Sequence, residues 1–235
     1  GRIKQEAAGH CRHPHLPLSD RHLRGACTLA RSGVSNGSRL MGVDVDDFWT
    51  FIELSRHAGP TQRERETFLG DRLGRISRHH LLDFVQHLSA TREPANTYQL
   101  WRAADIIMTA PCSMDSFHYF QMWLVGLGRH AYEAAIMDPD SLAGVPEVVR
   151  LASLPRPWQN EDYPDWESLE YVACEIGELR PDIDGDIRDV VTEERHVRLR
   201  MDPNPDDVQW ACLSTAEIAR RYPRLWKLFG EAWTE

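Results

Sequence analysis

The sequence is poor in lysine and contains no long apolar run. Only Lys4 and Lys227 are lysines, and we attribute the excess of arginine to a coding bias towards GC-rich DNA. No stretch approaches the ~20 apolar residues that a membrane-spanning helix needs, and the N-terminal segment lacks the apolar region of a secretory signal. The sequence therefore predicts a cytoplasmic protein that does not act in a membrane.

Common signatures of catalysis and cofactor binding are also missing. The chain has no glycine-rich phosphate loop, no Ser/His/Asp signature and no CxxC pair. Its five cysteines are odd in number and widely spread, which does not suit a disulfide framework and fits a reducing cytoplasm. We therefore expect neither a cofactor nor a metal ion.

Charge is distributed unevenly along the chain. Residues 1–40 carry seven basic and two acidic residues, so this stretch is +5, whereas the whole chain is −9 and residues 41–235 are −14. An acidic body repels phosphate backbones, which argues against binding to nucleic acid. We therefore expect the partner to be a protein, whose identity the sequence does not reveal.

The first forty residues differ from the rest in pattern as well as in charge. They show no sustained helical or strand period, so we predict a disordered leader at 1–40, with Met41 as a possible native start. Residues 41–235 are predicted to form a single helical domain. Within it, a core spans 43–180, and an acidic loop with a C-terminal helix spans 181–235.

Helix signals recur from Val43 onwards. Apolar residues return at intervals of three and four, and helix-capping residues precede them. We therefore predict an all-α, compact multi-helix bundle with about seven to nine helices and short turns, plus a segment at 196–201 whose alternation allows one short strand. The predicted capping residues are Asp44, Thr61 with Glu64, Ser77, Ser113, and Ser214 with Glu217.

The order of residues in the central block resembles a known family. The segments that carry the resemblance are Val43-Asp44-Val45-Asp46-Asp47-Phe48-Trp49, Leu100-Trp101-x-Ala103-Ala104, Cys112-Ser113-x-Asp115-x-Phe117-x-x-Phe120-x-x-Trp123-Leu124, Gly128-Arg129 and Asp138-Pro139-Asp140-Ser141-Leu142-Ala143. In this order they are similar to the domain of unknown function 4240 family of bacterial, often actinobacterial, proteins. The resemblance implies a helical cytoplasmic protein, and it supplies no established catalytic residues.

Four residues are candidates for catalysis. Cys112 lies at a predicted helix start, where a thiol can gain nucleophilicity, although a small buried cysteine beside aromatic residues is the commoner case. Asp115 and His118 are three residues apart on that helix, a spacing that suits two metal ligands, and a third group such as Glu170 would have to come from a later helix. Because no second such motif is present, no metal site is predicted.

Three tryptophans are candidates for binding. Trp158, Trp166 and Trp210 fall in loop-like or boundary segments, where exposed aromatic side chains suit a protein interface. We therefore predict a non-enzymatic protein-interaction or regulatory module. The alternative is a hydrolase-like enzyme with a pocket around Cys112, Asp115 and His118, and the sequence does not decide whether the protein is an enzyme.

Overall fold

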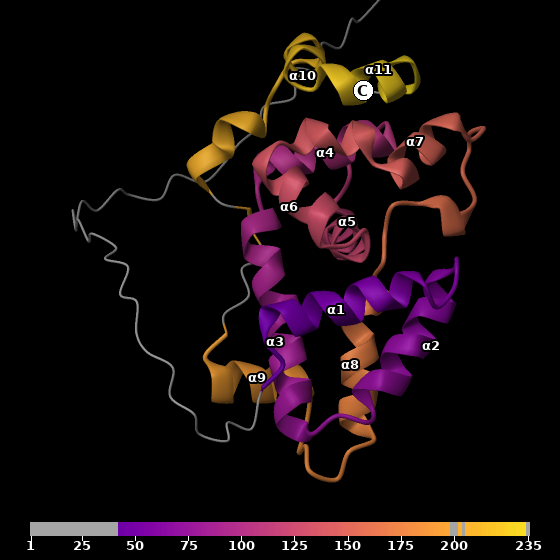
Figure 1. Cartoon of the computed structure of the whole chain (residues 1–235). Helices are drawn as coiled ribbons and strands as arrows, with labels where there is room; N and C mark the ends of the chain where they lie inside the picture. Colours follow the sequence, from indigo (N-terminus) through magenta and orange to yellow (C-terminus); the bar gives the residue numbers. More distant parts are fainter. Residues whose placement is uncertain (1–41, 198–201, 204, 234–235) are drawn as a thin grey trace, which may run out of the picture. The chain divides into compact units, whose positions relative to one another are not determined.

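The computed structural model describes residues 42–197, 202–203 and 205–233 (Figure 1). Within these ranges the chain forms eleven α-helices, four short 3-10 helices and no strand, which confirms the all-α prediction. The number of helices exceeds the predicted seven to nine, because several short helices lie in segments expected to be loops. The predicted leader at 1–40 and most of the predicted strand at 196–201 lie outside the described residues.

One group of helices packs around α3. Both α1 and α9 contact α3, α2 packs against α1 and α8, and α8 also contacts α9 (Figure 1). The bounds of this group are α1 Val45–Arg56, α2 Gln62–Leu73, α3 Arg78–Ala95, α8 Ser168–Glu178 and α9 Ile187–Arg195.

A second group gathers around α4 and the C-terminal helices. Helix α11 contacts α4, α7 and the 3-10 helix η1, and η1 contacts α6. Helix α5 (Met114–Gly126) joins the two groups, because it contacts α1 and α3 as well as α4 and α6 (Figure 1). The remaining bounds are α4 Tyr98–Met108, α6 Arg129–Met137, η1 Pro139–Gly144, α7 Pro146–Ser153, η2 Asn160–Asp162, η3 Pro205–Trp210, α10 Thr215–Arg221, α11 Pro223–Phe229 and η4 Gly230–Ala232.

The predicted capping residues sit where the helices begin. Asp44, Thr61 and Ser214 each accept a hydrogen bond from a first-turn backbone N–H, and the acidic residue three positions later completes a capping box. Ser77 and Ser113 cap α3 and α5 in the simpler way. Each cap satisfies a donor that would otherwise lack a partner, which fixes the start of the helix.

Two local predictions differ from the structure. Pro94 was expected to separate two helices, yet it lies in the last turn of α3, which ends one residue later at the buried Ala95. The acidic segment from 181 was expected to be a loop, yet it contains α9. Ile187 and Val191, one helical turn apart, are both buried and supply the apolar face that holds α9 against α3 and α8.

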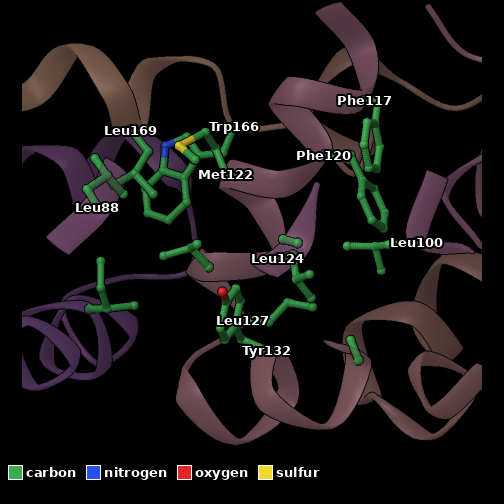
Figure 2. Close-up of a cluster of buried hydrophobic side chains, with 14 of the residues drawn as sticks. Leu88, Leu100, Phe117, Phe120, Met122, Leu124, Leu127, Tyr132, Trp166 and Leu169 are labelled. Carbon is green, nitrogen blue, oxygen red and sulfur yellow. The ribbon is translucent and has the colours of Figure 1, made fainter. Parts of the chain in front are cut away.

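The core is rich in aromatic side chains around α5 (Figure 2). Phe117 stacks on Trp101 with ring centroids 4.9 Å apart, and Phe120 lies 5.4 Å from Trp123. Figure 2 places Trp166 and Leu169 from a later segment in the same cluster. Helix α5 is therefore the central support for the surrounding candidate residues.

Candidate functional site

Cys112 lies in an environment that keeps its thiol protonated. The residue is half-buried just before α5, where its backbone N–H donates to Oδ1 of the fully buried Asp105 at 2.8 Å. Burial, followed by the nearby charge of Asp105, raises the pKa of the Cys112 thiol. This direction is opposite to the lowered pKa that an activated nucleophile needs.

His118 and Glu170 are brought together, as the sequence allowed. Nε2 of His118 on α5 lies 2.6 Å from Oε2 of Glu170 on α8, and this hydrogen bond lowers the pKa of Glu170 even though burial opposes the change. Nδ1 of His118 is buried and has no hydrogen-bond partner among the described residues. A catalytic imidazole needs one nitrogen that can reach its substrate. In His118 one ring nitrogen is bonded to Glu170 and the other is buried, so neither is available to a substrate.

Asp115 and Cys112 do not join this pair. Asp115 is exposed in the first turn of α5, where a carboxylate complements the helix dipole. In the described part of the chain, no hydrogen bond or ion pair links Cys112 or Asp115 to His118 or Glu170. The catalytic candidates therefore fall into separate environments.

A buried arginine lies beside Glu170. Arg92 is only 7% exposed, burial lowers its pKa, and the charge of Glu170 partly offsets this effect. Both residues border a small cavity of about 20 Å³, which also contacts Arg188 and Met122. A space of this size suits about one water molecule and is too small for an organic substrate.

The predicted binding tryptophans are less exposed than expected. Trp158 is 6% exposed and Trp166 is 1% exposed, so the expectation of exposed indole rings is wrong for these two residues; Trp210 is partly buried. Trp158 packs edge-on against Tyr163 and Phe229. Buried apolar side chains therefore hold the segment around 154–166 against the helices.

The segment containing Trp166 borders a cleft of about 710 Å³. Its walls are the turn between α1 and α2, the end of α5 and part of α7, together with residues 161–166. Trp123 and Tyr163 contribute aromatic surface, and the buried Trp166 completes the aromatic lining. This volume lies within the usual range for small-ligand sites.

Trp166, one of the residues that line this cleft, is held by two hydrogen bonds. Its indole Nε1–H donates to Oε1 of Glu66 at 2.7 Å, and its backbone N–H donates to the carbonyl oxygen of Tyr119 at 3.1 Å. The guanidinium of Arg65 lies 4.2 Å from the centre of the Trp166 ring. Arg65 is thus oriented by a cation–π contact to a side chain that is itself fixed.

Arg65 is half-buried and has no acidic partner at ion-pair distance among the described residues. Its Nε and Nη2 lie 3.3 and 3.2 Å from Oγ of Ser55, and Nη2 also donates to the carbonyl oxygen of Gly126 at 2.8 Å. Nη1 donates to no described residue. Burial, followed by the repulsion of Arg56, lowers the pKa of Arg65 to about 10.

Other charges at the cleft are mostly paired. Arg56 contacts Glu147 at 2.9 Å, and Arg150 contacts Asp162 at the same distance. Arg63, on the rim, is exposed and forms no ion pair with a described residue. With Glu161 as the third acidic residue beside four arginines, the lining carries one net positive charge on a strongly acidic chain.

Sequence reasoning did not find Arg65. The capping box at Thr61 located the start of α2, but nothing in the local pattern shows that Arg65 meets Trp166, since the contact joins segments far apart in the chain. Within the described ranges, no helix is long and apolar enough to cross a membrane. The same residues contain no group of three or more His, Cys, Asp or Glu side chains placed to hold a metal ion.

Comparison with known proteins gives one match. Residues 43–176 match the model of a family described as "Protein of unknown function (DUF4240)". No curated protein and no solved structure matches the chain.

Proposed function

The chain belongs to the DUF4240 family, and from this premise we propose that it is a non-enzymatic protein-interaction module of the cytoplasm. The observation that carries the proposal is the open cleft beside residues 161–166, with its aromatic surface and incompletely paired arginines. Such a mixture of apolar area and a few oriented polar groups is typical of recognition sites.

The environments of the catalytic candidate residues also favour an interaction module over an enzyme. A hydrolase-like enzyme would need a nucleophile or base that substrate can reach. The pKa of Cys112 is raised, and the second imidazole nitrogen of His118 is buried. The close His118–Glu170 pair is the one observation in favour of the enzyme alternative, and its role as a structural link between α5 and α8 accounts for it.

The test is affinity capture with the 235-residue chain as bait, from extract of the organism that makes the protein. Wild type is compared with a cleft variant, Arg63→Glu, and with Arg72→Glu as the matched control on the same helix. Arg63 borders the cleft, whereas Arg72 stacks over Phe68 in the last turn of α2. Both arginines are exposed, so reversal of either charge leaves the core in place and folding is preserved in both variants.

The expected result is a partner that wild type and Arg72→Glu recover equally and that Arg63→Glu recovers at least several-fold less. Quantitative mass spectrometry of the eluates measures the ratio. Capture that is equal for all three baits, or no captured protein in repeated experiments, contradicts an interaction through the cleft.

A further inference from the structure

The half-buried side chain of Arg65 lines the cleft. Three of its hydrogen bonds go to neutral oxygens of Ser55 and Gly126, and no carboxylate of the described residues lies within ion-pair distance. Three carboxylates act on Arg65 only from beyond that distance, those of Glu147, Glu53 and Glu66. A partly desolvated cation with no carboxylate in direct contact gains more from an arriving anion than an exposed one does, because the cost of its burial has already been met within the fold.

The geometry points to a ligand that approaches Arg65 from the cleft. The guanidinium of Arg65 lines the cleft together with Trp166 and lies 4.2 Å from the centre of the Trp166 ring, and its Nη1 has no hydrogen-bond partner among the described residues. Trp166 is itself held by Glu66 and by the backbone of Tyr119. A guanidinium held in this way loses little conformational freedom on binding.

The charge around the cleft selects a monoanion over a phosphate dianion. Arg56 and Arg150 are already engaged by Glu147 and Asp162. With Glu161 also present, the lining offers one net positive charge. The two negative charges of a phosphate dianion exceed this single positive charge, whereas one carboxylate balances it.

The rest of the cleft suits a peptide rather than a bare ion. Trp123 and Tyr163 both line the cleft, and Trp123 is half-buried whereas Tyr163 is 38% exposed. These rings provide surface for an apolar side chain next to the anion. A volume of about 710 Å³ has room for several side chains.

We propose that this cleft binds an acidic peptide segment of a protein partner, in which a glutamate or aspartate carboxylate pairs with Arg65 and Arg63 adds positive charge from the rim, while a neighbouring apolar residue packs on Trp123 and Tyr163. This proposal rests on the function proposed above and names the chemistry of its partner. Arginine and carboxylate form charge-assisted hydrogen bonds, which are the stronger kind in proteins.

The experiment is an NMR titration of the full chain that follows the indole N–H signal of Trp166, assigned with a Trp166→Phe variant. The first probe is a hexapeptide, acetylated at its N-terminus and amidated at its C-terminus, that contains one leucine followed by one glutamate between serines and glycines. The matched peptide carries glutamine in place of glutamate. The third probe is N-acetylglutamate as its α-amide, so that it too carries one carboxylate, and inorganic phosphate is the fourth.

The glutamate peptide is expected to shift the signal saturably and to bind at least tenfold more tightly than the glutamine peptide, N-acetylglutamate or phosphate. Arg63→Gln is expected to weaken the glutamate peptide about threefold and Arg65→Gln at least tenfold, while Arg72→Gln leaves it unchanged. Arg63 is on the rim, so its variant keeps the test valid if Arg65→Gln fails to fold.

Each other result overturns the proposal in a recognisable way. If the glutamate and glutamine peptides bind equally, the carboxylate is not what the cleft recognises. If phosphate binds more tightly than the glutamate peptide, the site is a phosphate site. If N-acetylglutamate binds as tightly as the glutamate peptide, the ligand is a small acid and not a peptide. If affinity capture recovers a partner whose binding depends on Arg63, these results reject only the acidic peptide as the ligand, and the proposed interaction module is retained. If capture gave none, a positive titration keeps the carboxylate site and rejects the protein partner.

Discussion

The imidazole of His118 and the carboxylate of Glu170 form a hydrogen bond of 2.6 Å between α5 and α8. Both side chains are mostly shielded from water, with 12% and 20% of their areas exposed. The bond lowers the pKa of Glu170 below its ordinary value of 4.5, although burial pulls in the other direction. The carboxylate therefore stabilises the fold in its ionised form.

This relationship predicts a specific loss of stability in acid. A carboxyl group whose pKa is lower in the folded state stabilises the protein above its unfolded pKa and loses that contribution as pH falls through the folded pKa. At pH 6, Glu170→Gln is expected to lower the free energy of unfolding by about 1–3 kcal/mol. The difference between wild type and variant should shrink as pH falls below 4.5.

Urea denaturation of both proteins between pH 6 and pH 3 measures this difference. Glu175→Gln is the matched control, because Glu175 is exposed on the same helix and forms no hydrogen bond within the described residues. It should change stability by less than about 0.5 kcal/mol at every pH. A constant difference for Glu170→Gln across the range would show that the ionised carboxylate is not what stabilises the link.

Gly126 is predicted to tolerate no side chain. An ideal Cβ at this position would lie 2.5 Å from Cε3 of Trp166, closer than real contacts allow. Although alanine is favoured over glycine in helices by about 1 kcal/mol, Gly126→Ala should therefore destabilise the protein by roughly 1–3 kcal/mol. It should also change tryptophan fluorescence, because Trp166 must move.

Thermal or urea unfolding measures the cost. Gly144→Ala provides the control, since its ideal Cβ would meet nothing within 4 Å. If Gly126→Ala were as stable as wild type while Gly144→Ala behaved as expected, the close packing of α5 against Trp166 would be incorrect.

The cysteines are predicted to differ in reactivity. Burial is the main cause that raises the pKa of Cys112, and it raises the pKa of Cys174 to about 11, whereas Cys212 is exposed. Because the thiolate is the reactive form, iodoacetamide at pH 8 should modify Cys212 at least tenfold faster than Cys112 or Cys174. Peptide mass spectrometry after timed labelling gives the rate at each position.

Denaturant should abolish this difference, which serves as the internal control for intrinsic reactivity. Rapid labelling of Cys112 in the native protein would instead favour the nucleophile hypothesis and, with it, the enzyme alternative.

Much of the fold could be predicted from the sequence because its signals are local. The capping serines, threonines and aspartates satisfy donors within the same turn, so Asp44, Thr61 and Ser113 identify helix starts without knowledge of the rest of the chain. Helix α9 was missed because two buried residues, Ile187 and Val191, are its only fully buried apolar anchors in an otherwise charged segment.

The candidate site was predicted only in part, since its contacts join distant segments. The sequence named both His118 and Glu170, and the structure brings them together. It gave no indication that Arg65 lies over Trp166, because neither residue belongs to a motif and the contact depends on how α2 packs. It also placed Trp166 at the surface, although the ring is buried against α5 and α2.

The last prediction concerns the attachment of the C-terminal helices. Asp140 is 4% exposed, and its carboxylate accepts hydrogen bonds from the backbone N–H groups of Arg224 and Leu225 and from Nε of Arg224. Asp140→Ala leaves these donors without their acceptor, so the free energy of unfolding should fall by about 2–4 kcal/mol. Asp140→Asn keeps one oxygen acceptor and should cost less.

Urea denaturation gives the size of the effect, and hydrogen exchange of the α11 amides gives its location. Exchange should accelerate in α11 more than in α3, because α11 is the helix that Asp140 holds against η1. Asp71→Ala is the control: it removes an exposed ion pair with Arg75 and should cost less than about 1 kcal/mol. Equal losses for Asp140→Ala and Asp71→Ala would mean that apolar contacts of Leu225 and Phe229 hold the C-terminal helices without help from this carboxylate.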